Sequence, residues 1–142
     1  MEGNNIQIFV EDVDIELDRG DVLIRQCLQL IEKEGCNCGF VNFILCSDKY
    51  LLELNRQYLQ HDYYTDIITF DNSEDEGIVE SDIFISIDRA KENALDHGVA
   101  FEKELERLFY HGLLHLTGYN DKEADDKKVM TERENYYLSL FA

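Results

Sequence analysis

Apolar residues recur along the chain with two different periods, which divide it into strands and amphipathic helices. Runs rich in β-branched and aromatic residues predict four strands. Stretches in which apolar residues recur every three or four positions predict five helices. The predicted strands are residues 6–10, 40–46, 65–70 and 83–87. The predicted helices are residues 21–35, a segment beginning after Ser47, and residues 88–96, 101–117 and 124–140.

The order of these elements predicts an α/β (α+β) fold, in which one four-stranded mixed sheet carries helices on its faces. Two strands follow each other directly, joined by an acidic loop over residues 71–82, so the sheet is not purely parallel. The 142 residues, 44% of them hydrophobic, match the size of one domain with its own core. We therefore expect residues 1–142 to form a single domain.

The balance of charge restricts the partners. The chain has 31 acidic residues against 13 Lys and Arg, and its formal net charge is −18. Nucleic-acid backbones are bound through clustered Lys and Arg, and no block of basic residues is longer than Lys127-Lys128. If RNA is the partner, a metal ion or a local basic patch must overcome the overall negative field.

The lack of targeting segments and the cysteine spacing predict a cytoplasmic protein. No apolar run reaches the roughly 18 residues of a membrane span, and residues 1–5 lack the basic start of a signal peptide. We expect a cytoplasmic protein with no membrane partner and no nucleotide cofactor. Cys36 and Cys38 form C-x-C, which is not the spacing of a structural zinc site, so reduced thiols are expected for all four cysteines.

The sequence HGLLHLTGYND, residues 111–121, carries the candidate chemistry. His111 and His115 are four residues apart within a predicted helix, so both imidazoles leave the same face. Gly118 can adopt a positive φ and end the helix, and Asp121 follows in the next loop. Two histidines from one helix and a third ligand from the loop after it form the layout of a catalytic metal site. The alternative is a pair of core histidines that accept ordinary hydrogen bonds.

A metal held by these three residues would leave a position for water and lower its pKa, which supports hydrolysis of a peptide or a phosphodiester. Each imidazole would bind through one nitrogen, and an acceptor would hold the other. The metallopeptidase motif H-E-x-x-H supplies its base from the residue after the first histidine. Here that residue is Gly112, so a peptidase would need another carboxylate, such as Glu80 or Asp82. The sequence alone assigns no catalytic residue.

The stretch from His111 to Asp121 closely resembles the signature H-G-x-L-H-L-x-G-Y-D-H of the YbeY family of bacterial metal-dependent endoribonucleases. Two further segments, 65–70 and 81–86, are similar to the family's T-D-V-L-S-F and G-D-I-x-I-S sequences. The resemblance implies a fold like that of zinc metallopeptidases. It also implies single-strand-specific cleavage of RNA in the processing of small-subunit rRNA and in ribosome maturation, with Zn²⁺ held by His111, His115 and Asp121.

The chain departs from the family pattern at two functional positions. Asp121 occupies the place where the family usually has a third histidine, which lowers the charge of the site by one unit. His97 is a further candidate for that role. Leu59 occupies the place of an arginine that faces the RNA in many relatives, and Arg56, about one helical turn earlier, is the candidate RNA contact.

Three functions are therefore compared below. The first is a zinc-dependent endoribonuclease that acts on rRNA. The second is a non-catalytic ribosome-assembly module in which the metal is structural. The third is a metallopeptidase. The ligand set does not fix the metal, because two histidines and a carboxylate also suit iron or nickel.

Overall fold

A computed structural model describes residues 5–142, and its elements follow the predicted order. Residues 1–4, which belong to the segment predicted to carry no signal peptide, lie outside the described residues. The strands are β1 (Ile6–Val10), β2 (Asn37–Cys46), β3 (Ile67–Asp71) and β4 (Ile78–Ser86). The helices are α1 (Gly20–Lys33), α2 (Asp48–Leu59), α3 (Ile87–His97), α4 (Phe101–Leu116) and α5 (Ala124–Leu140).

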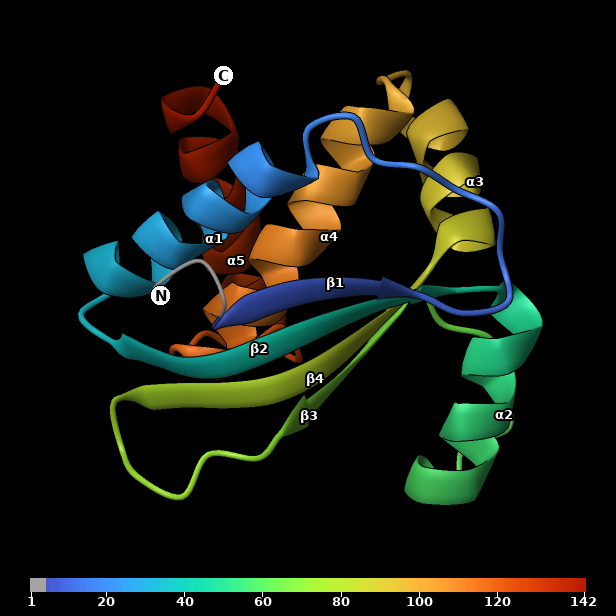
Figure 1. Cartoon of the computed structure of the whole chain (residues 1–142), viewed down its shortest axis with the longest axis horizontal. Helices are drawn as coiled ribbons and strands as arrows, with labels where there is room; N and C mark the ends of the chain where they lie inside the picture. Colours follow the sequence, from blue (N-terminus) through green and yellow to red (C-terminus); the bar gives the residue numbers. More distant parts are fainter. Residues whose placement is uncertain (1–4) are drawn as a thin grey trace.

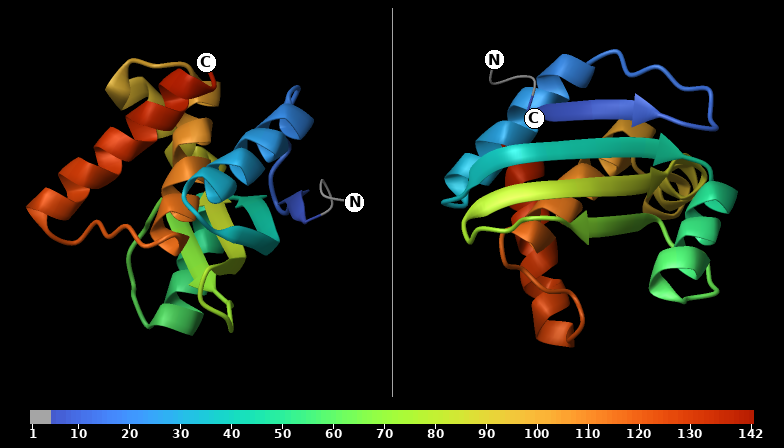
Figure 2. Two further views of the ribbon diagram at one scale, coloured as in Figure 1. Left: turned by 90° about the vertical axis from the view of Figure 1, so that its left-hand side faces the viewer. Right: turned by 60° about the horizontal axis from the view of Figure 1, so that its bottom comes forward.

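The four strands form one mixed sheet in the order β1-β2-β4-β3. β1, β2 and β4 are parallel, whereas β3 runs antiparallel to β4 at one edge (Figure 2). In the register of the last pair, Ile67 lies opposite Ile85 and Thr69 opposite Ile83. The predicted α/β class, with a mixed sheet of four strands, is confirmed.

Helices cover both faces of the sheet, as predicted. α1, α3, α4 and α5 lie on one face, and α2 lies on the other (Figure 1). The main core lies between the sheet and α1, α4 and α5. Its largest fully buried side chains include Phe43, Ile83, Phe109, Tyr110, Leu113 and Tyr137. A smaller apolar cluster on the other face joins α2 to β3 and β4 through Leu51, Ile68 and Phe84.

Gly112 sets how closely α4 approaches the sheet. A Cβ atom at this position would lie 3.1 Å from Cδ1 of Ile83 and 3.3 Å from Cδ1 of Ile67. Both distances are shorter than ordinary van der Waals contact, so only glycine permits this packing without displacement of the isoleucines. The sheet therefore fills the space beside Gly112 that a larger side chain would occupy.

Three predicted boundaries were wrong. β2 begins at Asn37 rather than residue 40, β3 covers 67–71 rather than 65–70, and β4 begins at Ile78, within the segment predicted as an acidic loop. In β4, Val79 points into the core, whereas Glu80 and Asp82 lie on the opposite, partly exposed face. This alternation is typical of a strand with one solvated face. The acidic side chains on that face made the sequence of the strand resemble a loop.

Within residues 5–142, no helix is both long and apolar enough to cross a membrane. The four cysteines are free thiols, as expected. Burial raises the pKa of the Cys46 thiol to about 12 and that of Cys38 to about 11, so both are uncharged at neutral pH.

Candidate metal centre

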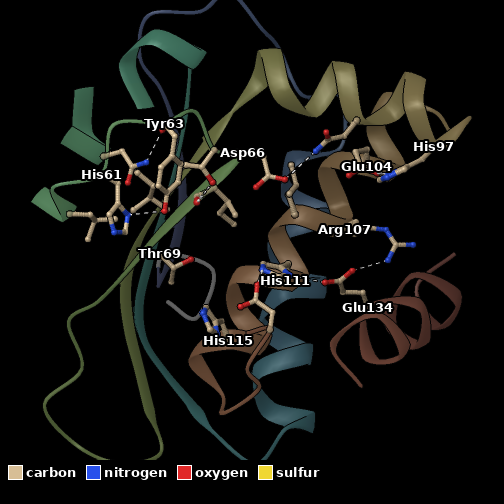
Figure 3. A pocket seen from close by; sticks show the side chains of 18 residues that line it. His61, Tyr63, Asp66, Thr69, His97, Glu104, Arg107, His111, His115 and Glu134 are labelled. Atoms are coloured by element: carbon tan, nitrogen blue, oxygen red, sulfur yellow. Dashed lines mark hydrogen bonds and ion pairs between the residues drawn. The ribbon is translucent and has the colours of Figure 1, made fainter. Parts of the chain in front are cut away.

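A pocket of about 670 Å³ opens between α4, α5, β3 and the segment that joins α2 to β3 (Figure 3). His111 and His115 border it from α4, and Glu134 from α5. Asp66 and Thr69 border it from β3 and the residues before it. The other residues that line it include Asn55, Leu59, His61, Tyr63, Thr65, Asn93, His97, Glu104, Arg107 and Asp121.

His111 is held in one orientation by two carboxylates. Its Nδ1 donates a hydrogen bond of 2.7 Å to Oε2 of Glu134, and its Nε2 lies 3.3 Å from Oδ2 of Asp121. The His111 side chain is 20% exposed and that of Glu134 is 8% exposed. Because Glu134 accepts from Nδ1, a neutral His111 presents the lone pair of Nε2 toward Asp121. Two acceptors that face each other at this distance require a proton or a metal cation between them.

His115 is fixed by the backbone that follows α4. Gly118 has a φ of 119°, which turns the chain back toward the helix. The carbonyl of Tyr119 then accepts a hydrogen bond of 2.7 Å from Nδ1 of His115. Both histidines thus have an acceptor on Nδ1, as the sequence predicted for metal ligands, and both keep Nε2 for another partner.

Acidic groups also control the protonation of His111. Burial disfavours the imidazolium, but the hydrogen bond and charge of Glu134, together with the charges of Asp121 and Asp66, outweigh it. The net result is a pKa of His111 above its ordinary value of 6.5. The pocket therefore stabilises positive charge at the Nε2 of His111, whether a proton or a metal ion supplies it.

The side chains of the pocket are of the types that bind a divalent metal, but in this structure they do not surround a common position. Within residues 5–142, no group of three or more His, Cys, Asp or Glu is close enough together to hold a metal ion as it stands. Two neutral imidazoles and a carboxylate nevertheless make a donor set suited to zinc. Asp121 is 38% exposed and lies in the connection between α4 and α5, where its position depends on a few loop residues.

Three hydrogen bonds that the sequence did not reveal support the site. Arg107 donates hydrogen bonds to Oε1 of Glu134 at 2.8 Å and to Oδ1 of Asn135 at 2.7 Å, so Glu134 bridges Arg107 and His111. On the opposite side, Asn93 donates to Oδ2 of Asp66 at 3.1 Å. Glu134 lies 23 residues from His111 in the chain, so no local spacing connects the two.

Other candidates from the sequence lie apart from the two histidines. His97 is at another part of the pocket, where its Nδ1 lies 3.1 Å from the buried carboxylate of Glu104 (Figure 3). Arg56 does not line the pocket, and its guanidinium is bound to Glu53 at 2.8 Å and Asp62 at 2.5 Å. Its predicted contact with RNA stays a prediction.

The carboxylates considered as peptidase bases do not reach the site. Asp82 accepts hydrogen bonds from Asn42 and Asn72, and neither Asp82 nor Glu80 lines the pocket. The hypothesis that one of them replaces the missing glutamate was wrong, because strand alternation directs both to the other face of the sheet.

A mixed α/β sheet that supports two histidines of one helix and a nearby carboxylate is typical of metal-dependent hydrolases. A family model described as "Endoribonuclease YbeY" matches residues 5–142, and the chain belongs to the YbeY family. The resemblance in the sequence is therefore confirmed. The family's description also confirms the predicted class of enzyme, a hydrolytic nuclease.

Relatives match over nearly the whole chain. "Endoribonuclease YbeY" of Cytophaga hutchinsonii is 50% identical over 141 residues, which cover 99% of this chain and 98% of the relative. The protein of that name from Flavobacterium psychrophilum is 44% identical over 133 residues, 94% of each chain. The solution structure of TM1509 from Thermotoga maritima superposes with a TM-score of 0.66 and 31% identity, covering 96% of this chain and 88% of the other.

Proposed function

We propose that this protein is a zinc-dependent endoribonuclease that cleaves single-stranded RNA during processing of small-subunit rRNA in the cytoplasm. The family's description and the donor chemistry of the pocket support this proposal. His111, His115 and Asp121 are the proposed ligands of one zinc ion, and residues 1–142 are proposed to act as one domain.

The observation that carries the proposal is the pair of fixed imidazoles. The Nδ1 atoms of His111 and His115 are both bound to acceptors, and the Nε2 of His111 faces Asp121. When bound, zinc supplies a Lewis acid and an activated water for attack on a phosphodiester.

The protein's own groups orient these ligands and prepare their protonation. Glu134 holds the Nδ1 proton of His111, so that Nε2 keeps its lone pair for a ligand. Arg107 fixes the other oxygen of Glu134 and balances its charge. The carbonyl of Tyr119 holds the Nδ1 proton of His115. These contacts order the imidazoles before substrate arrives, which reduces the reorganisation that catalysis requires.

The charges of the pocket also favour a second candidate, a non-catalytic module for ribosome assembly. Arg107 is the one Arg among the described lining residues, which include no Lys, and Glu134 already binds it. A phosphate that contacts Arg56 must compete with Glu53 and Asp62. In this alternative the metal stabilises the fold, the protein cleaves no RNA with or without the metal, and loss of the metal lowers stability alone.

A metallopeptidase is disfavoured by the packing of α4. Position 112, where the H-E-x-x-H motif places its base, lies against Ile67 and Ile83 rather than in the pocket. A glutamate there would be buried among apolar side chains, and the other two candidate carboxylates lie on the far face of the sheet.

Metal content and RNA cleavage test the proposal together. The purified protein is analysed for bound metal and incubated with an unstructured RNA from the small subunit, with and without a chelator. We expect one zinc ion per chain, cleavage that the chelator abolishes, and loss of both metal and cleavage in His115→Ala. Absence of stoichiometric metal in the unmodified protein would contradict the proposed site.

His97→Ala is the matched control, because it removes a histidine of the same pocket that is not a proposed ligand. This variant should keep its metal. If His97→Ala loses metal while His115→Ala keeps it, the ligand assignment is wrong. If His115→Ala loses metal and still cleaves RNA at the unmodified rate, the proposed metal chemistry is wrong. If the unmodified protein holds zinc but cleaves no RNA, the non-catalytic module replaces the endoribonuclease.

A further inference from the structure

Two aromatic side chains face the proposed ligands from the opposite wall of the pocket. His61 and Tyr63 belong to the segment between α2 and β3, and both line the pocket across from His111 and His115 (Figure 3). Their ring centroids are 5.0 Å apart at an interplanar angle of 19°, and the Tyr63 hydroxyl lies 2.9 Å from Nδ1 of His61. The Tyr63 residue is nevertheless 56% exposed, so the stacked pair still presents aromatic surface to solvent.

Hydrogen bonds with Asn55 hold the segment that contains this pair in place. Asn55, which is 1% exposed, donates from Nδ2 to the carbonyl of Tyr63 at 2.8 Å. The carbonyl of Asn55 accepts from the backbone N–H of His61 at 3.0 Å. Gln60 adopts a left-handed φ of 57° that turns the chain out of α2. The aromatic pair is therefore placed before any ligand binds, which lowers the entropy lost on binding.

Charge around the pocket limits what this surface can bind. Four carboxylates line the pocket, from Asp66, Glu104, Asp121 and Glu134. Arg107, which lines the pocket, and Arg56, which follows the lining residue Asn55, are both bound to carboxylates. Binding through a row of phosphate contacts is therefore disfavoured. The uncharged face of a nucleobase avoids this repulsion, since aromatic side chains bind unpaired bases by stacking whatever their sequence.

We propose that His61 and Tyr63 form a stacking platform for one unpaired nucleobase of the RNA substrate, next to the cleavage site. The inference rests on the proposed function, because RNA is the ligand that the metal centre would cleave. It adds the source of affinity and selectivity: a base within a duplex has no free face to offer Tyr63, whereas an unpaired base does.

Substitution of Tyr63 tests the platform by binding rather than by cleavage. The probe is a short, unstructured, fluorophore-labelled RNA, compared with the same RNA paired to its complement, and intact RNA is verified after each titration. We expect Tyr63→Ala to weaken binding of the single strand by about 5-fold to about 150-fold, the range for loss of one stacked base. Tyr63→Phe should bind nearly as the unmodified protein does, and binding of the duplex should not change.

Tyr64→Ala is the matched control, because Tyr64 is the next residue, is 51% exposed and does not line the pocket. It should bind the single strand as the unmodified protein does. An equal loss in Tyr64→Ala, or unchanged binding in Tyr63→Ala, would overturn the proposal.

A direct signal comes from Tyr63→Trp, since the chain contains no other tryptophan. Stacking of a base on the new indole should quench its fluorescence during titration with the single strand. Unchanged fluorescence during RNA binding would overturn the platform, as would quenching by an unfolded protein segment in place of RNA.

The dependence on salt separates stacking from phosphate contacts. The logarithm of the single-strand association constant should fall with the logarithm of salt concentration at a slope of about −0.7 or shallower, the value for one phosphate contact. A steeper slope that Tyr63→Ala leaves unchanged would overturn the proposal. If His115→Ala still cleaves RNA but Tyr63→Ala loses binding, the proposed metal chemistry fails and the platform stands.

Discussion

Glu134 and His111 are joined by a hydrogen bond of 2.7 Å between Oε2 and Nδ1, although 23 residues separate them in the chain. The Glu134 side chain is 8% exposed, and its other carboxylate oxygen binds Arg107 at 2.8 Å. A carboxylate in this position fixes both the tautomer and the orientation of the imidazole, and it raises the basicity of the ligating nitrogen. The contact between α4 and α5 thus orients His111 for its proposed role as a metal ligand.

Glu134→Gln should weaken zinc binding by about 10-fold to 100-fold, the usual effect of altering the residue that orients a ligating histidine. The amide can still accept from Nδ1 but no longer carries the charge that makes the imidazole more basic. Competition with a zinc-binding dye measures the affinity. Glu132→Gln, at an exposed position of the same helix, should retain the affinity of the unmodified protein. Equal affinities for both variants would remove Glu134 from the proposed site.

Asp121 is tested by two substitutions that differ in their ability to bind metal. Asp121→Asn removes the negative charge at nearly constant size, and it should lower zinc affinity by more than the about 10-fold to 100-fold caused by loss of an orienting residue. Asp121→His restores a neutral ligand of the type found in the family signature and should keep one zinc ion per chain. Zinc titration followed by calorimetry distinguishes the two. Unchanged affinity in Asp121→Asn would show that Asp121 does not bind the metal.

Much of the fold and the proposed ligands were accessible from the sequence because they depend on local spacing. The four-residue interval of His111 and His115 places both on one face of α4, and Gly118 marks the turn that follows. The start of β4 was missed because Glu80 and Asp82 occupy its solvated face. Acidic residues there lack the apolar character by which a strand is recognised.

The supporting residues of the site could not be found in this way. Glu134 and Asp66 reach the pocket from elements whose positions depend on packing across the sheet. His61 and Tyr63 carried no periodic signal, because a segment between elements has none. Their placement depends on Asn55, whose buried amide interacts with the segment after α2. Contacts of this kind join residues far apart in the chain, so no short spacing in the sequence predicts them.

Gly112→Glu tests whether the packing of α4 excludes the peptidase arrangement. The added carboxylate would enter the apolar contact with Ile67 and Ile83, and an unpaired buried charge destabilises a protein by about 3 kcal/mol or more. We expect a large fall in the free energy of unfolding, measured with urea, and no cleavage of unfolded protein.

Gly112→Ala adds volume at this position without a charge, so it separates the two causes of destabilisation in Gly112→Glu. Its single methyl group strains the contact, but alanine favours a helix over glycine by about 1 kcal/mol, which offsets part of the strain. This variant should stay within about 2 kcal/mol of the unmodified protein. A stable Gly112→Glu variant that cleaves unfolded protein would instead restore the peptidase hypothesis.

Glu34 connects the end of α1 to the part of the chain that carries the site. Its carboxylate accepts hydrogen bonds from the Tyr119 hydroxyl at 2.9 Å, Arg133 at 2.7 Å and the Tyr137 hydroxyl at 2.5 Å. Burial alone would raise the pKa of Glu34, but these hydrogen bonds and the charge of Arg133 outweigh it and lower the pKa below 4.5. Tyr119 also supplies the carbonyl that accepts from His115, so this cluster supports the proposed metal centre.

Because the pKa of Glu34 is lower in the folded state, its ionised form stabilises the fold at every pH above its unfolded value of 4.5. This contribution is lost as the pH falls below 4.5 and through the lower folded value. Glu34→Gln should therefore reduce the free energy of unfolding at neutral pH by about 1.5 to 3 kcal/mol, the range for hydrogen bonds to a charged group. The loss should shrink as the pH falls below 4.5. Urea denaturation across this range measures it.

Glu32→Gln, at an exposed position of α1, is the control for the general effect of removing one negative charge from an acidic protein. It should leave the free energy of unfolding within about 0.5 kcal/mol of the unmodified protein at all pH values. If Glu34→Gln and Glu32→Gln show the same dependence on pH, the three hydrogen bonds of Glu34 do not stabilise its ionised form. The zinc affinity of Glu34→Gln is a second test. Loss of the contact to Glu34 should make Tyr119 more mobile, weaken its hydrogen bond to His115 and so lower zinc affinity. Glu32→Gln should leave zinc affinity unchanged.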